Sequence, residues 1–264
     1  MKYIVTTSHK PSAELIARAN KLAEEYGVPY ISRRKLVEQL KEGKLDIDFY
    51  YVLDRNEQLC IIYDEHKFFF HPSMAKLRLK NYREGQRDHL IENLKLEGNE
   101  EILDTTFGLG SEALLMAYFL ETGRIVGLEA SLHVYRVVNH GLKHYPFQYQ
   151  WMRDAVSKIT LLNQDLRNFL RNCADEAFDI IYCDPMFEVP QYSSSSLNPL
   201  RPFAIYDPIT LHDVREMIRV AKKRVVLKSR VTDTLFEELE KHIEFSNISG
   251  SKSSGVIYGV IEKL

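Results

Sequence analysis

The sequence predicts an α/β protein in which a small α+β domain precedes a doubly wound, mostly parallel sheet. From about residue 81 onward, short apolar runs alternate with amphipathic segments at helical spacing, which is typical of parallel sheets covered by helices on both faces. Before that point the alternation is absent and a hairpin pattern takes its place. We therefore assign residues 1–75 to the small domain and residues 76–264 to the large domain.

The small domain is expected to begin with a strand over residues 2–7 and a helix from Ser12 to Gly27. Apolar residues recur at helical spacing between these two positions, and glycine commonly ends a helix. The remaining elements expected in this domain are a helix over 34–41 and hairpin strands over 49–53 and 59–63.

The large domain is expected to alternate helices with strands. The expected helices span 84–95, 111–121, 131–143, 149–156, 166–173, 210–222 and 233–241. The expected strands span 101–104, 124–129, 159–163, 178–183 and 224–228, with terminal runs over 243–249 and 255–262. The two terminal runs flank a Ser-rich turn, so we expect an antiparallel hairpin at one edge of the sheet. This pattern resembles the fold of class I methyltransferases, which have a seven-stranded, Rossmann-like sheet with a reversed last strand.

Composition places the chain among ordinary globular proteins. Hydrophobic residues make up 45% and charged residues 27%, and no apolar run approaches the roughly 18–20 residues that a membrane span needs. The N-terminus lacks the apolar core of a secretion signal, so we expect a cytoplasmic protein. The three cysteines have no metal-ligand spacing, and we expect neither a disulfide framework nor a metal site.

Charge is distributed unevenly along the chain, whose formal net charge is −2. Residues 1–80 carry 14 Lys or Arg against 11 Asp or Glu, whereas residues 81–264 carry 21 against 26. Basic clusters lie at 33–35 and between 76 and 87. These clusters form either a solvated face or contacts to phosphate groups.

Two segments that are far apart in the sequence follow predicted strands. Residues 104–113 read DTTFGLGSEA and residues 182–187 read YCDPMF, and each comes after an apolar run typical of a buried parallel strand. Both segments should emerge at the carboxyl edge of the sheet, where open α/β sheets bind their ligands.

The first segment has the features of a nucleotide-binding turn. Gly108 and Gly110 allow a tight turn and the close approach of a ligand, and Ser111 and Glu112 would begin the following helix. Glu129, at the end of the next strand, can accept hydrogen bonds from ribose hydroxyls. This spacing fits both a dinucleotide and S-adenosylmethionine (SAM).

Asp104 favours SAM over a dinucleotide. A carboxylate at this position would repel a pyrophosphate by like charge, whereas it can hold the cationic methionine part of SAM. Asp165 follows the third strand, where its side chain either meets the adenine amino group or caps the helix over 166–173. We therefore expect SAM as the cofactor.

The second segment contains the motif Asp-Pro-Met-Phe, which fits methyl transfer to an amine. An exocyclic amine conjugated to a base ring is a poor nucleophile. The Asp184 carboxylate and the Pro185 carbonyl would accept its two hydrogens and orient its lone pair, and Phe187 would stack on the base. The alternative is a turn that merely ends the strand, with Phe187 packed inward.

A Pro- and Ser-rich segment over 188–208 follows this motif, and its length is typical of a lid or a substrate-gripping loop. Tyr192 and Arg201 in this segment can engage the substrate or its phosphates. Lys228 and Arg230, at the end of the fifth strand of the large domain, can do the same. For each of these four side chains an ordinary surface or loop position is the alternative.

Five segments together resemble the motifs of one family, in the same order along the chain. They are HPSMAKLRL (71–79), DTTFGLGSEA (104–113), GLEAS (127–131), YCDPMF (182–187) and KRVVLKSR (223–230). The family is that of the RsmJ-like methyltransferases, which act on a guanine N2 amine in small-subunit ribosomal RNA. The resemblance implies a class I fold and SAM contacts from the following residues: Ser111, Glu112, Glu129, Ala130, Asp165, Leu166 and Asp184.

The leading hypothesis is a SAM-dependent N-methyltransferase that acts on guanine N2 in small-subunit (16S) rRNA. Its partner would be this RNA or the small ribosomal subunit, with no membrane and no metal. The acidic large domain and the uncharged SSSS run at 193–196 fit a second reading, in which the acceptor is a small-molecule or protein amine. A third reading is a non-catalytic module that binds SAM or a dinucleotide.

Overall fold

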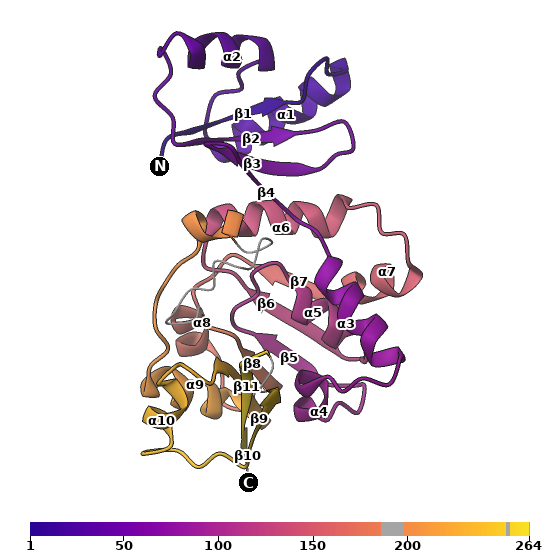
Figure 1. The fold of residues 1–264 in the computed structure, drawn as a ribbon, viewed down its shortest axis with the longest axis vertical. Helices are drawn as coiled ribbons and strands as arrows, with labels where there is room; N and C mark the ends of the chain where they lie inside the picture. Colours follow the sequence, from indigo (N-terminus) through magenta and orange to yellow (C-terminus); the bar gives the residue numbers. More distant parts are fainter. Residues whose placement is uncertain (186–197, 252–253, 264) are drawn as a thin grey trace. The chain divides into compact units, whose positions relative to one another are not determined.

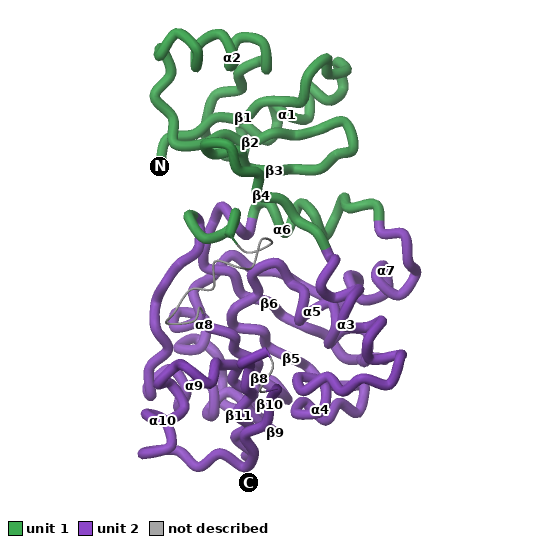
Figure 2. The backbone as a smooth tube through the Cα atoms, in the orientation of Figure 1, with its two compact units in different colours: residues 1–71, 136–146, 195–202 green, residues 72–135, 147–194, 203–264 purple. Residues whose placement is uncertain are grey.

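The computed structural model describes residues 1–185, 198–251 and 254–263. The chain divides into two compact units (Figure 2). Unit 1 comprises residues 1–71, 136–146 and 195–202, and unit 2 comprises residues 72–135, 147–194 and 203–264. Within the described ranges, no helix is both long and apolar enough to cross a membrane, and no three His, Cys, Asp or Glu side chains are grouped as metal ligands.

Unit 1 is built on a four-stranded sheet in the order β1-β2-β3-β4 (Figure 1). Its first two strands pair in parallel, and the other neighbouring pairs are antiparallel. The elements are β1 (Tyr3–Thr7), α1 (Ala13–Tyr26), α2 (Arg33–Lys41), β2 (Phe49–Leu53), β3 (Leu59–Tyr63) and β4 (His66–Phe69). The predicted strand, helices and hairpin are present, and β4 extends the hairpin by one strand.

Helix α1 begins and ends where its local sequence predicts. The Ser12 Oγ accepts a hydrogen bond from the Leu15 N–H at 3.1 Å, which satisfies one amide of the first turn. Gly27 ends the helix with φ at 67°, a conformation that glycine adopts at little cost. Between these ends, Ala19 and Ala23 on the buried face allow the helix to approach the sheet closely.

Aromatic rings surround one guanidinium group in the core of unit 1. Tyr3 stacks on Phe49 with the ring centroids 4.9 Å apart, and Tyr51 meets Tyr3 edge-on. The Arg136 guanidinium lies 3.7 Å from the centroid of the Tyr26 ring and donates a hydrogen bond to the Tyr3 hydroxyl at 3.0 Å. These contacts make the later residues of helix α6 (Leu132–His144) part of unit 1.

Unit 2 is built on a seven-stranded sheet in the order β10-β11-β9-β8-β5-β6-β7. Its strands are β5 (Glu101–Asp104), β6 (Arg124–Leu128), β7 (Ile159–Leu162), β8 (Phe178–Cys183), β9 (Ala221–Arg230), β10 (Asn247–Ser251) and β11 (Val256–Glu262). Its helices, besides the start of α6, are α3 (Ser73–Arg83), α4 (His89–Leu94), α5 (Ser111–Tyr118), α7 (Gln150–Ser157), α8 (Leu166–Asn172), α9 (Leu211–Val220) and α10 (Leu235–Leu239). A 3₁₀ helix, η1 (Asn198–Phe203), lies at the boundary between the two units in the sequence.

The predicted reversed strand is confirmed. Strands β9, β8, β5, β6 and β7 all run parallel, whereas β11 pairs antiparallel with both β9 and β10. Tyr258 of β11 lies opposite Lys228 of β9 in this ladder. The last strand is therefore inserted between its hairpin partner and the parallel strands, as the class I fold requires.

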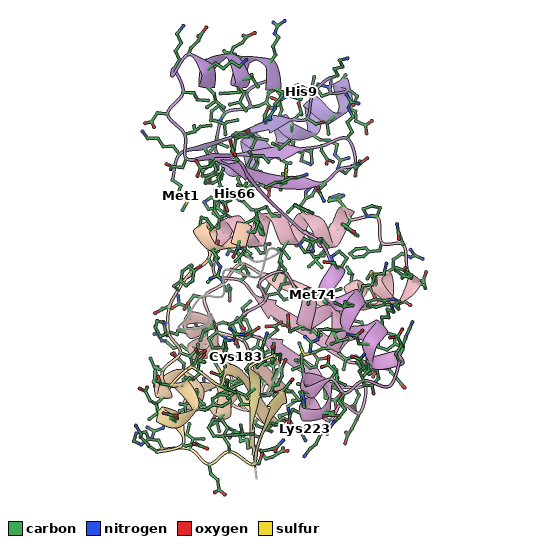
Figure 3. The ribbon with its side chains drawn as sticks, in the orientation of Figure 1. Met1, His9, His66, Met74, Cys183 and Lys223 are labelled. Carbon is green, nitrogen blue, oxygen red and sulfur yellow. The ribbon has the colours of Figure 1, made fainter. Side chains whose placement is uncertain are left out.

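Helices cover both faces of this sheet (Figure 1). Helices α8, α9 and α10 bury one face, where Leu103, Ile181 and Leu227 belong to a single apolar cluster. Cys183, labelled in Figure 3, is buried in the same cluster. Because strand side chains alternate between faces, the neighbours of these residues point to the opposite side, toward α3, α4 and α5.

The structure differs from the prediction of one helix over 84–95. The helix in this range, α4, begins only at His89, and α3, which the sequence did not predict, ends before it at Arg83. Between them lies a turn in which Gly85 has φ at 86°. Asp88 begins α4, because its carboxylate accepts hydrogen bonds from the Leu90 and Ile91 amides at 3.1 and 3.3 Å. A turn glycine and a capping aspartate therefore place the start of α4 five residues after the predicted one.

The Phe107 ring packs between two glycines and fixes the turn after β5. A Cβ atom built on Gly127 would lie 2.1 Å from Phe107 Cδ2, and one built on Gly110 would lie 2.5 Å from Phe107 Cε1. The Phe107 amide also donates to the Leu128 carbonyl at 2.9 Å. The turn is therefore held against β6 by packing that only glycine permits at position 127.

We expect Gly127→Ala to destabilise the protein by about 1–3 kcal/mol, since the added methyl group displaces a buried ring. Chemical denaturation followed by circular dichroism measures the loss. The double variant Phe107→Leu/Gly127→Ala is the control, because a smaller side chain at position 107 should recover part of the lost stability. An unchanged denaturation midpoint in Gly127→Ala would contradict the packing described here.

Candidate active site

Four neighbouring strands of unit 2 carry charged residues at one edge of the sheet. β5 ends at Asp104, Glu129 and Asp184 follow β6 and β8, and Lys228 lies near the end of β9. These strands are parallel and adjacent in the order β9-β8-β5-β6, so their carboxyl ends meet. The structure thus brings the two polar segments of the sequence together.

Three hydrogen bonds join these two segments directly. The Thr105 amide and hydroxyl both donate to the Tyr182 carbonyl, at 2.9 and 3.0 Å. In return, the Asp184 amide donates to the Thr106 Oγ1 at 2.6 Å. The backbone that carries Asp184 is therefore fixed relative to the backbone that carries Asp104.

The turn between β5 and α5 leaves open space for a ligand. Gly108 and Gly110 have φ values of 52° and 71°, and the Gly110 amide donates to the Phe107 carbonyl at 2.8 Å. A Cβ built on Gly108 would meet no atom within 4 Å, so this side of the turn is open. Ser111 and Glu112 begin α5, as the sequence predicts.

Glu129 closes the far side of this turn. Its Oε2 accepts a hydrogen bond from the Gly108 amide at 3.1 Å, and its Oε1 accepts one from the Ser131 amide at 2.8 Å. Burial raises the pKa of the Glu129 carboxyl to about 7, although the two amides oppose this shift. Next to it, the Asn163 amide group donates to the carbonyls of Glu129 and Ala130 at 2.7 and 3.3 Å.

Asp104 is a buried carboxyl group without an ion-pair partner among the described residues. Its exposed fraction is 1%, and its Oδ1 accepts a hydrogen bond from the Thr106 amide at 3.1 Å. Burial raises the pKa of Asp104 well above its usual value, and the carboxylates of Glu112, Asp184 and Glu129 raise it further. A cationic ligand would relieve this accumulation of negative charge.

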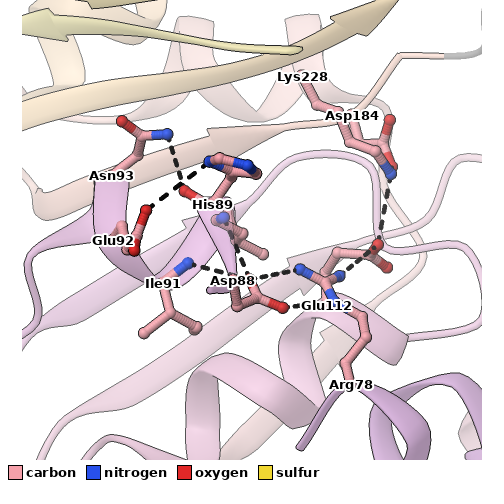
Figure 4. Close-up of polar contacts among 10 residues, drawn as sticks. Arg78, Asp88, His89, Ile91, Glu92, Asn93, Glu112, Asp184 and Lys228 are labelled. Atoms are coloured by element: carbon pink, nitrogen blue, oxygen red, sulfur yellow. Dashed lines mark hydrogen bonds and ion pairs between the residues drawn. The ribbon is translucent and has the colours of Figure 1, made fainter. Parts of the chain in front are cut away.

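A chain of ion pairs lies beneath the same edge (Figure 4). The Lys228 Nζ lies 2.5 Å from Asp184 Oδ2 and 3.4 Å from Glu112 Oε1. Arg78 of α3 contacts Glu112 at 3.1 Å and binds both carboxylate oxygens of Asp88, at 2.8 and 2.9 Å. All five side chains are less than a quarter exposed. The face covered by α3, α4 and α5 therefore carries a continuous network from Asp184 to the start of α4.

The network favours the ionised form of Glu112 more strongly than that of Asp184. Burial disfavours the Glu112 carboxylate, yet Lys228 and Arg78 outweigh this effect and lower its pKa to about 2. For Asp184, burial raises the pKa and Glu112 adds to the rise, while Lys228 opposes both. Glu112 is thus firmly ionised, and ionisation of Asp184 depends on Lys228.

Sequence reasoning placed Arg78 in a basic cluster and gave no role to Asp88. In the structure Arg78 is mostly buried, and its charge is paired with the carboxylates of Asp88 and Glu112. The available signal was the position of Arg78 within the HPSMAKLRL segment. Its partners are separated from it by 10 and 34 residues, so the pairing follows only from how α3, α4 and α5 pack together.

The other predicted site residues have varied positions. Asp165 caps α8, where its carboxylate accepts a hydrogen bond from the Asn168 amide at 3.1 Å, and Leu166 packs against the apolar cluster. Pro185 follows Asp184 and is partly buried. Contact of Asp165 and Leu166 with adenine stays a prediction.

Phe187 and Tyr192 lie outside the described residues. Arg201 belongs to unit 1 and donates to the Asn198 side chain at 3.2 Å. Arg230 is buried in unit 2 and donates to the Ser254 carbonyl in the β10–β11 turn at 3.2 Å. Substrate contacts by these residues stay predictions.

We expect Arg78→Met to destabilise the protein by about 3 kcal/mol, because it leaves Asp88 and Glu112 without their shared cation in a largely buried site. Arg83→Met is the matched control on the same helix. Arg83 is exposed and stacks on Tyr118, so its loss should cost less than about 1 kcal/mol. Urea denaturation compares the two variants, and equal losses would show that the internal network contributes no special stability.

Comparisons with known proteins agree with this geometry. The profile of a family described as "Putative SAM-dependent methyltransferase" matches residues 51–248. The chain is 31% identical over 264 residues to a Bacillus subtilis (strain 168) protein, "Uncharacterized protein YpiP", covering 98% of this chain and 99% of that one. It is 25% identical over 198 residues to the ribosomal RNA small subunit methyltransferase J of Francisella philomiragia, covering 69% of this chain and 80% of that one.

Among solved structures, a SAM-dependent methyltransferase from Neisseria gonorrhoeae has the same fold. It superimposes with a TM-score of 0.60 at 14% sequence identity, over 98% of this chain and 95% of that one. The similarity to the RsmJ-like family expected from the motifs is therefore present as a distant one, and the class I fold is confirmed.

The residues at the edge of the sheet also fit the cofactor of this family. Asp104 is buried and has no ion-pair partner in the described part of the chain, which suits a cationic group. Glu129 presents carboxylate oxygens beside the turn, and Gly108 leaves room for a ligand. The chain belongs to the family of SAM-dependent methyltransferases, with S-adenosylmethionine as its cofactor.

Proposed function

We propose that this protein methylates the N2 amine of a guanine in small-subunit (16S) ribosomal RNA. The observation that carries the proposal is the position of Asp184. Its carboxylate lies at the carboxyl edge of the sheet, one strand away from Asp104, and is followed by Pro185. Lys228 engages Oδ2, and Oδ1 has no hydrogen-bond partner among the described residues. Within residues 1–185, 198–251 and 254–263 nothing competes for Oδ1, which can accept a hydrogen from an acceptor amine.

The residues of this chain would act by orienting the amine. SAM supplies a methyl group on a positively charged sulfur. The Asp184 Oδ1 and the Pro185 carbonyl accept the two hydrogens of the amine, so that its lone pair points along the line of attack. Phe187 stacks on the base and holds its plane. The N–C bond would form as the methyl–sulfur bond breaks, so the positive charge would pass to the nitrogen, which is then acidic and would lose one of these hydrogens as a proton to solvent.

The choice of rRNA as the substrate is supported by the relatives. The Francisella protein is named as a methyltransferase of small-subunit ribosomal RNA, and this chain matches 80% of its length. The excess of basic residues in the first 80 positions, 14 against 11, gives that part of the chain a charge suited to phosphate. A cytoplasmic location goes with such a substrate.

A second candidate acceptor is a small-molecule or protein amine. Its support is the charge of residues 81–264, which carry 26 acidic against 21 basic side chains. The affinity of the protein for RNA as a function of salt separates the two candidates. Phosphate contacts would give a steep loss of affinity with rising salt, and an enzyme for a small molecule would show no such slope.

We expect the affinity for SAM to rise with pH and to level off above about pH 7. The Glu129 pKa of about 7 means that its carboxyl is partly protonated in the free protein, whereas ribose hydroxyls favour the carboxylate. Binding should therefore release a proton, and the affinity should fall by up to about tenfold per pH unit below 7. Calorimetry in buffers of different ionisation enthalpy measures both effects. Glu129→Gln should bind SAM more weakly and should release fewer protons on binding than the unaltered protein, because only Asp104 then remains as a buried carboxyl group that faces the ligand. Equal proton release by the two proteins would contradict this role.

The direct test of the proposed function is methylation in vitro. Purified protein, tritiated SAM and small ribosomal subunits from a strain lacking the gene should give labelled N2-methylguanine. Asp184→Asn should lower the rate at least about 100-fold, because the amide cannot replace the charged acceptor. Asp175→Asn is the control, since Asp175 is exposed and pairs with Arg219 elsewhere in unit 2. Absence of label from every RNA tested would refute the rRNA assignment.

A further inference from the structure

Lys228 is the one cation that contacts Asp184 among the described residues. Its Nζ lies 2.5 Å from Asp184 Oδ2, and its side chain is only 13% exposed. The β8 and β9 strands are parallel neighbours in which Cys183 lies opposite Leu227, so the next pair of residues in register is Asp184 and Lys228. The register of β8 and β9 therefore brings Lys228 next to Asp184.

We propose that Lys228 is a positioning residue for methyl transfer: its ammonium group holds the Asp184 carboxylate ionised and fixed through Oδ2, which leaves Oδ1 to accept a hydrogen from the acceptor amine. This inference rests on the proposed role of Asp184 and extends it to a second residue. Lys228 makes no contact with the acceptor in this role and acts only through Asp184.

Asp184 needs such a partner because most of the groups around it favour the neutral acid. Burial raises its pKa, and Glu112 of α5 raises it further, while Asp104 lies on the adjacent strand. The phenols of Tyr182 on β8 and Tyr258 on β11 face the same cluster and are neutral. The cations that oppose this rise are Lys228 of β9 and the more distant Arg78 of α3. A protonated Asp184 would present a donor where the amine requires an acceptor.

Lys228 is in turn held by the rest of the network. Glu112 Oε1 lies 3.4 Å from Lys228 Nζ and 3.1 Å from the Arg78 guanidinium, and Arg78 binds both oxygens of Asp88. Asp88 is itself fixed by the amides at the start of α4. The ammonium group is therefore placed between two carboxylates by three helices and two strands, which limits its movement away from Asp184.

The alternative role of Lys228 is contact with a substrate phosphate. The two roles predict different behaviour of Lys228→Met. A phosphate contact would reduce the salt dependence of RNA binding and leave the titration of Asp184 unchanged. A positioning role would change the titration of Asp184, whether or not RNA is present.

The test is a carboxyl titration of Asp184 by NMR on protein labelled with ¹³C at aspartate carboxyls, with Asp184→Asn used to assign the signal. In Lys228→Met the Asp184 pKa should rise by about 1–3 units, because the nearest opposite charge is lost. Lys228→Arg keeps the charge and should titrate close to the unaltered protein. Lys222→Met is the matched control on β9, since Lys222 is half-exposed and lies 3.7 Å from Asp179 at the other end of β8.

Glu112→Gln gives a test in the opposite direction and retains Lys228. Removing this carboxylate takes away a like charge and frees Lys228 for Asp184, so the Asp184 pKa should fall. This variant decides the matter if circular dichroism shows that Lys228→Met does not fold. An Asp184 pKa that is unchanged in Lys228→Met, or in Glu112→Gln where Lys228→Met does not fold, would overturn the inference.

The pH dependence of methyl transfer gives a second measurement once an acceptor substrate has been identified. The acid limb of the kcat/KM profile should move to higher pH in Lys228→Met by the same amount as the Asp184 titration, and Lys228→Arg should restore it. A loss of activity without any shift of the acid limb would contradict the role. Because the titration needs no acceptor, its failure refutes the role of Lys228, whereas failure to methylate RNA refutes the proposed function and leaves the titration unaffected.

Discussion

The unfavourable burial of negative charge at one edge of the unit 2 sheet governs the rest of the site. Asp104, Glu129 and Asp184 all lie there, and each is stabilised differently. Glu129 accepts hydrogen bonds from two backbone amides, and Asp184 pairs with Lys228. Asp104 has only one amide donor and no cation among the described residues. The negative charge of Asp104, beside the open turn, is therefore the least compensated of the three. A cofactor with a cationic methionine end is complementary to it.

The scaffold explains why these groups stay in place. Parallel pairing of β5 with β8 brings the two motifs into register, and the Thr105 and Thr106 hydrogen bonds lock their ends together. Alternation along the strands then sends Leu103, Ile181 and Leu227 toward α8, α9 and α10. The opposite face, toward α3, α4 and α5, carries apolar side chains such as Ile102 and Ile180 and, at the carboxyl ends of the strands, the charged ones. The same alternation that builds the core therefore gathers the ionic network on the other face.

Most of the fold could be predicted from the sequence, because apolar spacing and helix-end residues such as Ser12 and Gly27 act locally. The convergence of the DTTFGLGSEA and YCDPMF segments followed from the rule that parallel strands end at one edge. The start of α4 was predicted too early, since Gly85 was not recognised as a turn residue or Asp88 as the capping residue. The ionic network was missed because Arg78, Glu112 and Lys228 meet only through tertiary packing. The predicted strand over 224–228 was also too short: β9 extends to Ala221 and Arg230 because β8 and β11 supply pairing partners for its polar ends.

A crystal structure with S-adenosylhomocysteine tests this view of the carboxylates most directly. We expect the amino group of the ligand within hydrogen-bond distance of Asp104, the ribose hydroxyls on Glu129, and Asp184 Oδ1 open beside the sulfur while Oδ2 remains on Lys228. A ligand whose amino group lies away from Asp104, or an Asp184 that has left Lys228 to bind the cofactor, would contradict it.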